Sequence, residues 1–275
     1  MSHKRGVAIL IAALWISAAA RAADTAISSG VLPPPASDWT ITIGAEGRLE
    51  PAFQGSRHDL WRPYPLFDLR RVGTPERFRS PRDGAGIALF EAGNFQLGPV
   101  GQLRSGRSEA NEPALRGLGR VRWTVEAGIF AEYWWVPWLR SRAEVRQGFG
   151  GHHGIVSDLM LDAVIPVTGQ LTMSGGPRVT FASTRATSPY FDINALQSAL
   201  SGLPMFNARG GVHSFGAGTQ ARYRWTPQWA THAFVEYERL TGDAAKSPLV
   251  VQRGSANQLT FGLGATHSFD IQGFW

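Results

Sequence analysis

The sequence predicts an all-β fold: a transmembrane, antiparallel, up-and-down β-barrel of about twelve strands (ten to twelve), behind a cleaved N-terminal signal peptide. Three observations predict it. The chain begins with a secretory-type segment, most of the remainder alternates apolar and polar residues with a period of two, and short connections alternate with long ones. The composition agrees, because only 17% of the residues are charged while 32 are Gly and 10 are Trp, as expected for crowded strands and aromatic girdles.

The first 22 residues have the three parts of a secretory signal. Lys4 and Arg5 supply positive charge, residues 7–20 are apolar, and Ala20-Arg21-Ala22 supplies a cleavage site. An apolar run this short does not span a bilayer as a helix. We therefore expect export with cleavage near residue 22 (signal peptide 1–22), a proline-rich periplasmic leader at 23–38 and an outer-membrane barrel at 39–275.

Charge and cysteine content exclude several classes of protein. Removing residues 1–22 takes away three basic residues and no acid, so the net charge falls from +6 to +3. The remaining arginines are spread along the chain without the clustered patch that a nucleic-acid site needs, so no nucleic-acid partner is expected. Because the chain has no Cys, it forms no disulfide and no thiolate metal site.

Two segments show the alternation most clearly. Residues 39–50 put Trp39 and four aliphatic side chains on one face and mainly Thr, Glu and Arg on the other. Residues 120–133 repeat the pattern, with an apolar face that includes Trp123, Val125 and Tyr133. A strand this long exceeds the usual length of about 5–6 residues in globular proteins. It suits a tilted membrane crossing, which needs about 9–11 residues.

Strand-like patterns recur along the whole chain after the leader: 39–50, 61–71, 75–80, 84–92, 95–105, 120–133, 138–149, 154–165, 170–183, 211–226, 228–240 and 257–269. The pattern at 75–80 is the weakest. With twelve strands, the long connections (51–60, 106–119, 184–210, 241–256) all fall at one end of the barrel. The tight turns (92–94, 134–137, 166–169, 226–227) and both chain ends fall at the other, periplasmic end, as in bacterial barrels.

The residue types on the two strand faces favour a membrane over water. The outward face carries aromatic residues, several of them near strand ends, where membrane interfaces hold them: Trp39, Trp123, Tyr133, Trp229, Tyr237 and Phe269. The inward face carries charges in rows, such as Arg140, Arg142, Glu144 and Arg146. A dry sandwich core could not hold such a row, whereas a hydrated lumen can. The alternative is a periplasmic barrel or sandwich that exposes this face to water.

Several sequence blocks match one known family. They are PAFQGS at 51–56, PLFDLR at 65–70, FQLGP at 95–99, SPYFDI at 188–193 with SGL at 201–203, and, most specifically, YERLTGDA at 237–244 followed by KSPLV at 246–250. With these blocks the chain resembles the MltA-interacting protein (MipA)/OmpV family of outer-membrane proteins over nearly all of 39–269. A C-terminal extension and a shortened 71–84 region depart from the family pattern.

The resemblance implies a non-enzymatic protein of the outer membrane. The family's named member resembles a scaffold that joins a murein transglycosylase to a murein synthase, so outer-membrane lipid and these two enzymes are the expected partners, without a cofactor. A small porin-like channel is the alternative function, and a barrel hydrolase acting on lipid is a third hypothesis. The oligomeric state and any binding residues stay open.

The residues themselves predict no catalytic, cofactor or metal site. Three adjacent pairs hold candidate ligands or nucleophiles: His152-His153, His213-Ser214 and His267-Ser268. Adjacent residues of a strand point to opposite faces, so none of these pairs predicts a metal clamp or a nucleophile–base dyad. Asp158, Asp162 and Glu144 could serve acid–base chemistry in a lumen. Beside the arginines of the inward row, they instead predict an ion-paired interior wall.

Residues 192–201 have apolar residues at helical spacing. Asp192 or Asn194 is the expected N-cap of a short helix. Its apolar face would hold Ile193, Leu196, Ala199 and Leu200. Such a helix either packs over the barrel mouth or acts as a plug or docking element.

Overall fold

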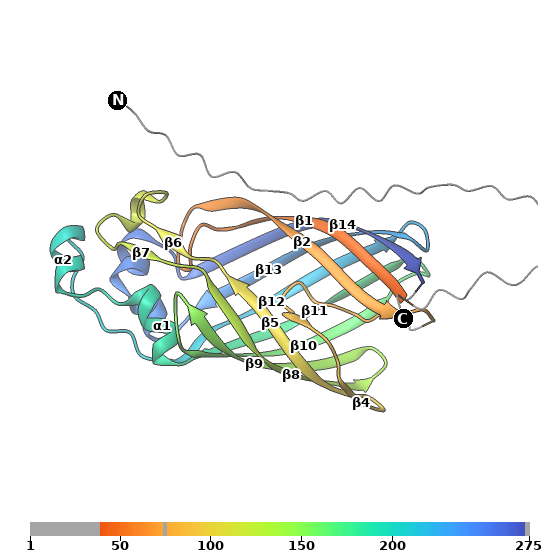
Figure 1. Ribbon diagram of the computed structural model, residues 1–275. Helices are drawn as coiled ribbons and strands as arrows, with labels where there is room; N and C mark the ends of the chain where they lie inside the picture. The colour runs from red at the N-terminus through yellow and green to blue at the C-terminus, as the bar shows by residue number, and fades with distance from the viewer. Residues whose placement is uncertain (1–38, 74–75, 273–275) are drawn as a thin grey trace, which may run out of the picture. The chain divides into compact units, whose positions relative to one another are not determined.

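The computed structural model describes residues 39–73 and 76–272; the predicted signal peptide and the leader at 23–38 lie outside them. Ten long antiparallel strands curl into a barrel (Figure 1). In the order of their pairing they are β2 (Asp59–Arg71), β1 (Trp39–Pro51), β14 (Asn257–Ile271), β13 (Trp229–Leu240), β12 (Gly211–Arg224), β11 (Leu171–Ala182), β10 (Ile155–Pro166), β9 (Leu139–Gly150), β8 (Thr124–Val136) and β5 (Phe95–Arg104). Two short strands on β5, β3 (Ala85–Gly86) and β4 (Phe90–Ala92), complete a twelve-stranded sheet. The predicted antiparallel β-barrel is confirmed.

The first and last strands pair with each other, so the described chain begins and ends at the same end of the barrel. Trp39 lies opposite Ile271 in the β1–β14 ladder. The same end carries the tight turns β4–β5, β8–β9, β10–β11 and β12–β13, and the long connections lie at the other end. By the convention of bacterial barrels, the tight-turn end is the periplasmic end and the other is the outer end.

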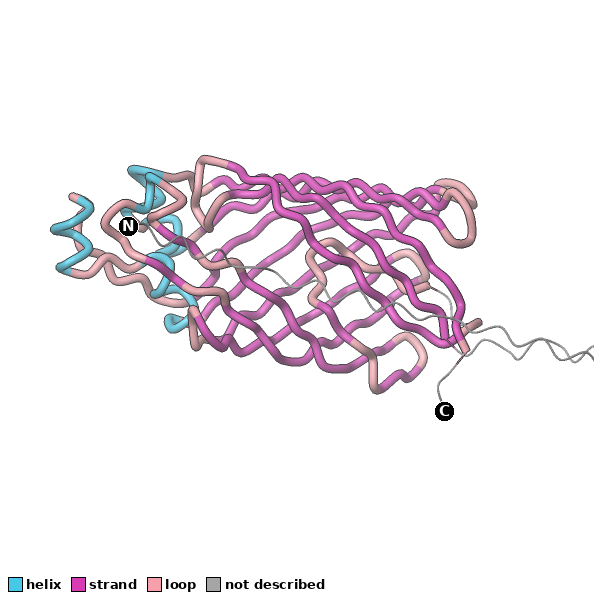
Figure 2. The backbone as a smooth tube through the Cα atoms, turned by 45° about the horizontal axis from the view of Figure 1, so that its top comes forward, coloured by secondary structure: helices cyan, strands magenta, loops and turns pink. Residues whose placement is uncertain are grey.

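The predicted strand at 75–80 is wrong. Residues 76–80 are not in a strand, and residues 76–84, called here the inner segment, run inside the barrel (Figure 2). The directions of the later strands still agree with the prediction. β2 runs toward the periplasmic end, the inner segment runs back through the lumen toward the outer end, and β3 and β4 run toward the periplasmic end again. Five of the eight residues at 76–83 are charged and Pro81 cannot donate a ladder hydrogen bond. Charged side chains that face lipid raise the free energy of the folded barrel, so a lipid-facing strand of this composition would be destabilising.

The predicted strand at 84–92 is also interrupted. Only β3 and β4 form within it, and both pair with β5. Within the described residues, β2 and β3 are the two ends of the hydrogen-bonded strand order, and the inner segment leaves the wall between them. At the edge of β2, Arg79 donates a hydrogen bond to the Phe67 carbonyl at 3.2 Å.

The four long connections pack together into a cap over the outer end (Figure 1). The cap contains β6 (Arg107–Ser108), η1 (Pro113–Leu115), β7 (Arg120–Val121), α1 (Thr184–Phe191), α2 (Ala195–Ser201), α3 (Gly242–Lys246) and η2 (Leu249–Arg253). Two apolar clusters hold it. One joins Phe53, Leu115, Ile193 and Leu249, and the other centres on Phe191, which is fully buried. In the part of the chain that the structure describes, no helix is long and apolar enough to cross a bilayer.

The predicted helix at 192–201 forms as α2, shorter than expected. Asn194 caps it in a capping box with Gln197, whereas Asp192 accepts a hydrogen bond from the Ala208 amide at 2.6 Å. The predicted apolar face is wrong in part. Ile193 is buried in the cap, but Leu196 and Leu200 are 67% and 65% exposed. The helix therefore stands on the cap and does not plug the lumen (Figure 1).

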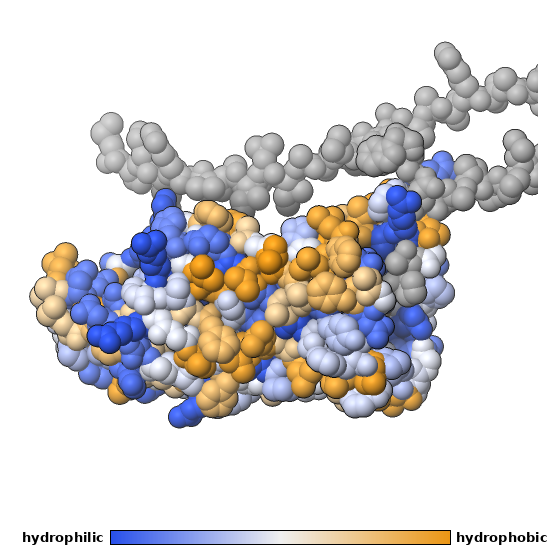
Figure 3. Space-filling view, turned by 90° about the horizontal axis from the view of Figure 1, so that it is seen from below, coloured by the Kyte–Doolittle hydropathy of each residue, from blue (hydrophilic) through white to orange (hydrophobic). Residues whose placement is uncertain are grey.

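The outward face of the strands is apolar and bordered by aromatic residues. Trp123, Tyr133, Trp229, Tyr237 and Phe269 are exposed on it, as predicted, while Trp39 is half-buried. Trp61, Trp135, Trp138 and Trp225 extend the two aromatic borders. Hydrophobic residues gather along the barrel wall in the face seen in Figure 3. This is the surface that a bilayer requires of a spanning barrel.

Candidate functional site

Buried, ion-paired side chains line the interior wall of the barrel. The inward row predicted on β9 is fully inside: Arg140, Arg142, Glu144 and Arg146 are all buried. Arg140 contacts Asp162 at 3.1 Å and Glu132 at 2.9 Å, and Arg142 contacts Glu144 at 2.8 Å. Arg146 pairs with Asp158. The predicted ion-paired wall is confirmed.

Strand register explains this wall. Asp158 lies directly opposite Glu144 in the β9–β10 ladder, and Asp162 lies opposite Arg140. Residues two apart on one strand share a face. Arg142 and Arg146 therefore both reach Glu144 on their own strand, whereas Arg140 pairs with carboxylates on β8, on β10 and in the inner segment. In the described chain, Arg140 and Arg146 each have three carboxylate partners, so loss of one partner would weaken the compensation of a buried charge, which is destabilising.

The inner segment continues this network across the lumen. Arg82 reaches Glu236 at 2.6 Å and Glu238 at 2.8 Å on β13, and donates to Thr180 on β11 at 2.7 Å. Asp83 contacts Arg140 on the opposite side at 2.7 Å. The inner segment thus ties β13 and β11 to β9 through the barrel interior.

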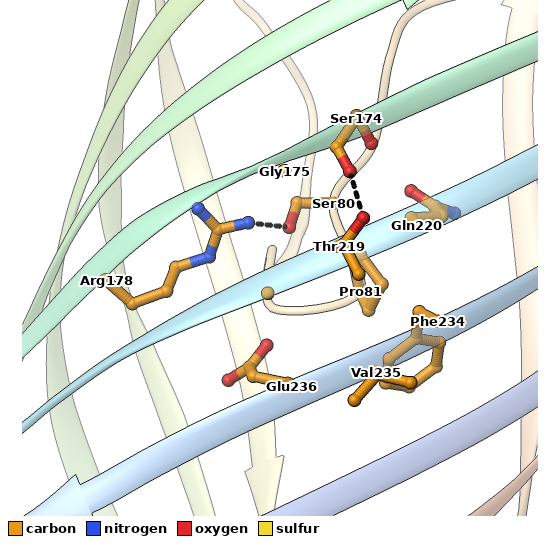
Figure 4. Close-up of a pocket in the computed structure, with 11 residues that line it drawn as sticks. Ser80, Pro81, Ser174, Gly175, Arg178, Thr219, Gln220, Phe234, Val235 and Glu236 are labelled. Carbon is orange, nitrogen blue, oxygen red and sulfur yellow. Dashed lines mark hydrogen bonds between the residues drawn. The ribbon is translucent and has the colours of Figure 1, made fainter.

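A second set of contacts seats the middle of the inner segment. Ser80 accepts a hydrogen bond from Arg178 at 2.9 Å, and Ser80 and Pro81 lie against β11–β13 (Figure 4). The gap left between them and the wall has a volume of only about 10 Å³, at the limit of what holds one water molecule. The Gly84 amide donates to Glu144 at 3.1 Å, and a Cβ at Gly84 would lie 2.5 Å from Val100. On this side of the lumen the inner segment lies against the wall, and a second space of about 130 Å³ lies between the segment and β1, β2 and β14.

The histidines do not form a metal site. His152 is buried, with its Nε2 3.0 Å from Glu126 and its Nδ1 accepting the Gly154 amide at 3.2 Å, whereas His153 is exposed. The pair diverges, as predicted. Among the described residues no group of three or more potential ligands gathers. His267 and Ser268 also point to opposite faces of their strand, as predicted. His267 packs between Trp229 and Phe269, whereas Ser268 forms a hydrogen bond with Thr42.

The expectation that His213 and Ser214 point to opposite faces is wrong. Thr180 pairs with Ser214 and Phe181 with Val212, so His213 is the extra residue of a β-bulge and both side chains are buried. His213 lies against the Phe191 ring, with 5.5 Å between centroids. Neither ring nitrogen of His213 nor the Ser214 hydroxyl has a hydrogen-bond partner among the described residues. The two therefore do not form a nucleophile–base dyad.

Arg107, under the cap, is a buried cation without a carboxylate partner among the described residues. Within residues 39–73 and 76–272 its side chain donates one hydrogen bond, to the Pro189 carbonyl at 3.5 Å, and its Nε and Nη1 atoms have no partner. Burial lowers the pKa of Arg107 to about 10. The side chain therefore remains protonated at pH 7 and carries the cost of desolvation.

A cavity of about 700 Å³ lies at the periplasmic end, below the inner segment; we call it the vestibule. Its lining comes from the inner segment and from the ends of β4, β5, β8, β10, β11 and β12. Four arginines line it: Arg77, Arg79, Arg222 and Arg224. It lies within the usual range of about 300–1,000 Å³ for ligand pockets.

Sequence reasoning missed both the inner segment and the vestibule. The charge density of 76–83 was the available signal for the first, because no lipid-facing strand carries five charges in eight residues. Arg222 and Arg224, two apart near the end of β12, were a weaker signal for the second.

The family comparison covers most of the chain. Residues 43–269 match the family model described as MltA-interacting protein MipA. A search of curated proteins finds no match.

Several solved structures are similar in fold. They include the COG4313 outer membrane channel from Pseudomonas putida F1, with 12% identity and a TM-score of 0.44 over 88% of this chain and 100% of that chain. The NanC porin has 9% identity and a TM-score of 0.41 over 83% of this chain and 98% of that chain. OprG from Pseudomonas aeruginosa has 10% identity and a TM-score of 0.29 over 85% and 96%.

Proposed function

The chain belongs to the MipA family, and from that premise and from the segment that crosses its lumen we propose that it is an outer-membrane barrel acting as a non-enzymatic scaffold for murein-remodelling enzymes. A murein transglycosylase and a murein synthase are the partners. The family's description as MltA-interacting supports the first of them.

The observation that carries the proposal is the inner segment, which crosses the lumen. A porin needs a wide continuous aqueous path, whereas here the inner segment crosses the lumen and bridges β9, β11 and β13. It leaves a gap of about 10 Å³ against β11–β13 and one of about 130 Å³ toward β1, β2 and β14. The cap covers the outer end with two apolar clusters. A barrel closed in this way serves through its surfaces, and its periplasmic end is the surface that faces the murein layer.

The proposed location is the outer membrane, reached by export. The basic and apolar parts of residues 1–22 support export, and the aromatic borders of the outward face support insertion into a bilayer. With the tight turns on the periplasmic side, the long connections and the cap face outward.

Crosslinking in intact cells tests the scaffold role. The full chain, carrying an affinity tag, is crosslinked in the intact cells, purified under denaturing conditions and probed for the transglycosylase and the synthase. We expect both enzymes to be recovered, and not with an unrelated outer-membrane barrel of equal abundance. Equal recovery with the unrelated barrel would contradict the proposal.

The alternative function, a porin-like channel, requires a different structure of the lumen. A wide channel would need the inner segment to leave the lumen, which breaks the contacts of Arg82 and Asp83. Planar-bilayer conductance of the intact protein distinguishes the two functions, since a scaffold gives no steady conductance. The lipid-hydrolase hypothesis is tested by the phospholipid and lipid A composition of a deletion strain, which we expect to be unchanged.

A further inference from the structure

The vestibule has the lining of a binding site for an acidic saccharide. The turn residues Gly169 and Gln170 line it, as does Trp134 near the end of β8. These residues lie at the periplasmic end of the barrel, so the vestibule lies at that end of the lumen. The inner segment closes it toward the outer end. A ligand therefore reaches it from the periplasm.

Charge pairing leaves two of the four vestibule arginines for a ligand. Arg222 pairs with Glu76 and Arg77 with Glu91. The third vestibule carboxylate, Glu132, already contacts Arg140 and Arg142.

Among the described residues, the Arg79 and Arg224 side chains donate hydrogen bonds only to backbone carbonyls. Arg79 donates to Phe67 at 3.2 Å and Arg224 to Gly169 at 2.8 Å. Among the described residues neither has a carboxylate within 4.0 Å, and both side chains are exposed. A guanidinium presents a planar fork of donors that matches a carboxylate in bidentate geometry. These two side chains are suited to bind ligand carboxylates.

The rest of the lining suits sugar rings. Amide and hydroxyl side chains line the walls: Gln96, Gln170, Thr172, Ser174 and Gln220. Phe78 meets Trp134 edge to face, with 6.4 Å between the ring centroids, so aromatic carbon also faces the space. Sugars present hydroxyls at their edges and C–H groups on their faces, which this combination of polar and aromatic groups complements.

We infer that the vestibule binds a fragment of murein, an amino-sugar backbone whose stem peptide carries free carboxylates, through Arg79 and Arg224. The choice of murein among acidic saccharides rests on the proposed function. The vestibule would hold the scaffold's periplasmic end against the polymer that its partner enzymes cut and extend.

Titration calorimetry on the full-length mature protein in detergent micelles tests this inference. The probes are a purified disaccharide–tetrapeptide from murein, diacetylchitobiose (a similar amino-sugar backbone without carboxylates) and trigalacturonate (carboxylates on a different sugar). We expect the murein fragment to bind at least tenfold more tightly than either control, and more weakly as salt rises. Equal binding of diacetylchitobiose would overturn the role of the arginines, and equal binding of trigalacturonate the choice of murein.

Variants assign the binding to the two arginines. Arg79→Gln/Arg224→Gln should weaken binding of the murein fragment at least tenfold. The matched control is Arg239→Gln, because Arg239 is exposed near the outer end of β13 and contacts only Asn257. Unchanged binding in the double variant would overturn the site. Heat-modifiable gel migration verifies that each variant is folded.

The outcomes of the calorimetry and of the crosslinking experiment can be told apart. Murein binding without recovery of either enzyme in the crosslinking experiment would contradict the scaffold and leave the vestibule site standing. Recovery of both enzymes without murein binding would overturn the vestibule site alone.

Discussion

At the scale of single residues, side-chain parity was the most predictable property. The inward row from Arg140 to Arg146 and the outward aromatic residues lie as the alternation predicts, because the pleat of a strand fixes direction without knowledge of the partners. The predicted direction of the His213 side chain was wrong, because a β-bulge inserts one extra residue there. A bulge depends on the register of two strands far apart in sequence, so the local pattern around His213 could not reveal it.

The lipid-facing surface predicts a depth-dependent cost of charge. Ile129 lies mid-strand on β8 and is 59% exposed, whereas Val125, 56% exposed, lies next to the interfacial Trp123. Ile129→Arg should lower the free energy of unfolding by about 2–4 kcal/mol, and Val125→Arg by about 0–1 kcal/mol. Urea titration in lipid vesicles measures both. Equal costs for the two variants would contradict the assignment of the membrane midplane.

The unpaired cation under the cap predicts a stabilising substitution. Arg107→Met removes a buried charge and keeps a side chain of similar length, so we expect the free energy of unfolding at pH 7 to rise by about 1–3 kcal/mol. Because the pKa of Arg107 is lowered to about 10, the wild-type side chain is charged below that pH. The advantage of the variant should shrink as the pH rises above about 10. A loss of stability in Arg107→Met would show that the guanidinium has a partner in the folded protein.

At the scale of elements, the long strands were predictable and the inner segment was not. Nine of the ten long strands follow the predicted ranges to within two residues at each end, and the tenth, β8, starts and ends slightly later, because sustained alternation is a local signal. The segment 76–84 lacks that signal. Its place is set by Glu236 and Glu238 on β13 and by Arg140 on β9, contacts with residues distant in sequence. The vestibule could not be predicted for the same reason, since the inner segment forms one of its walls.

The inner segment should control conductance. Replacing residues 76–83 with a flexible Gly-Ser linker removes the contacts of Arg82 and Asp83, so we expect stable single-channel currents where the wild type shows none. Planar lipid bilayers give the measurement. Replacing the outer helix α2 by the same linker is the control, because none of its residues is buried. A linker variant that stays silent would show that the cap alone closes the barrel.

At the scale of the whole molecule, the barrel has two surfaces of opposite character. Its exterior is apolar between aromatic borders, and its interior is polar and ion-paired. A water-soluble sandwich reverses this arrangement, because its core is the apolar side. Fold class was therefore predictable from the sequence, since the two faces differ in residue type along nearly every strand. The passage of the inner segment through the lumen and the packing of the four loops into a cap were not predictable, because both depend on contacts between residues far apart in the sequence.

Sedimentation of the purified mature chain, with and without detergent, tests the transmembrane barrel most directly. The apolar exterior needs a lipid-like solvent, so we expect a single monodisperse species in detergent and aggregation when detergent is removed. A monodisperse, folded species in plain buffer would contradict the membrane-spanning barrel.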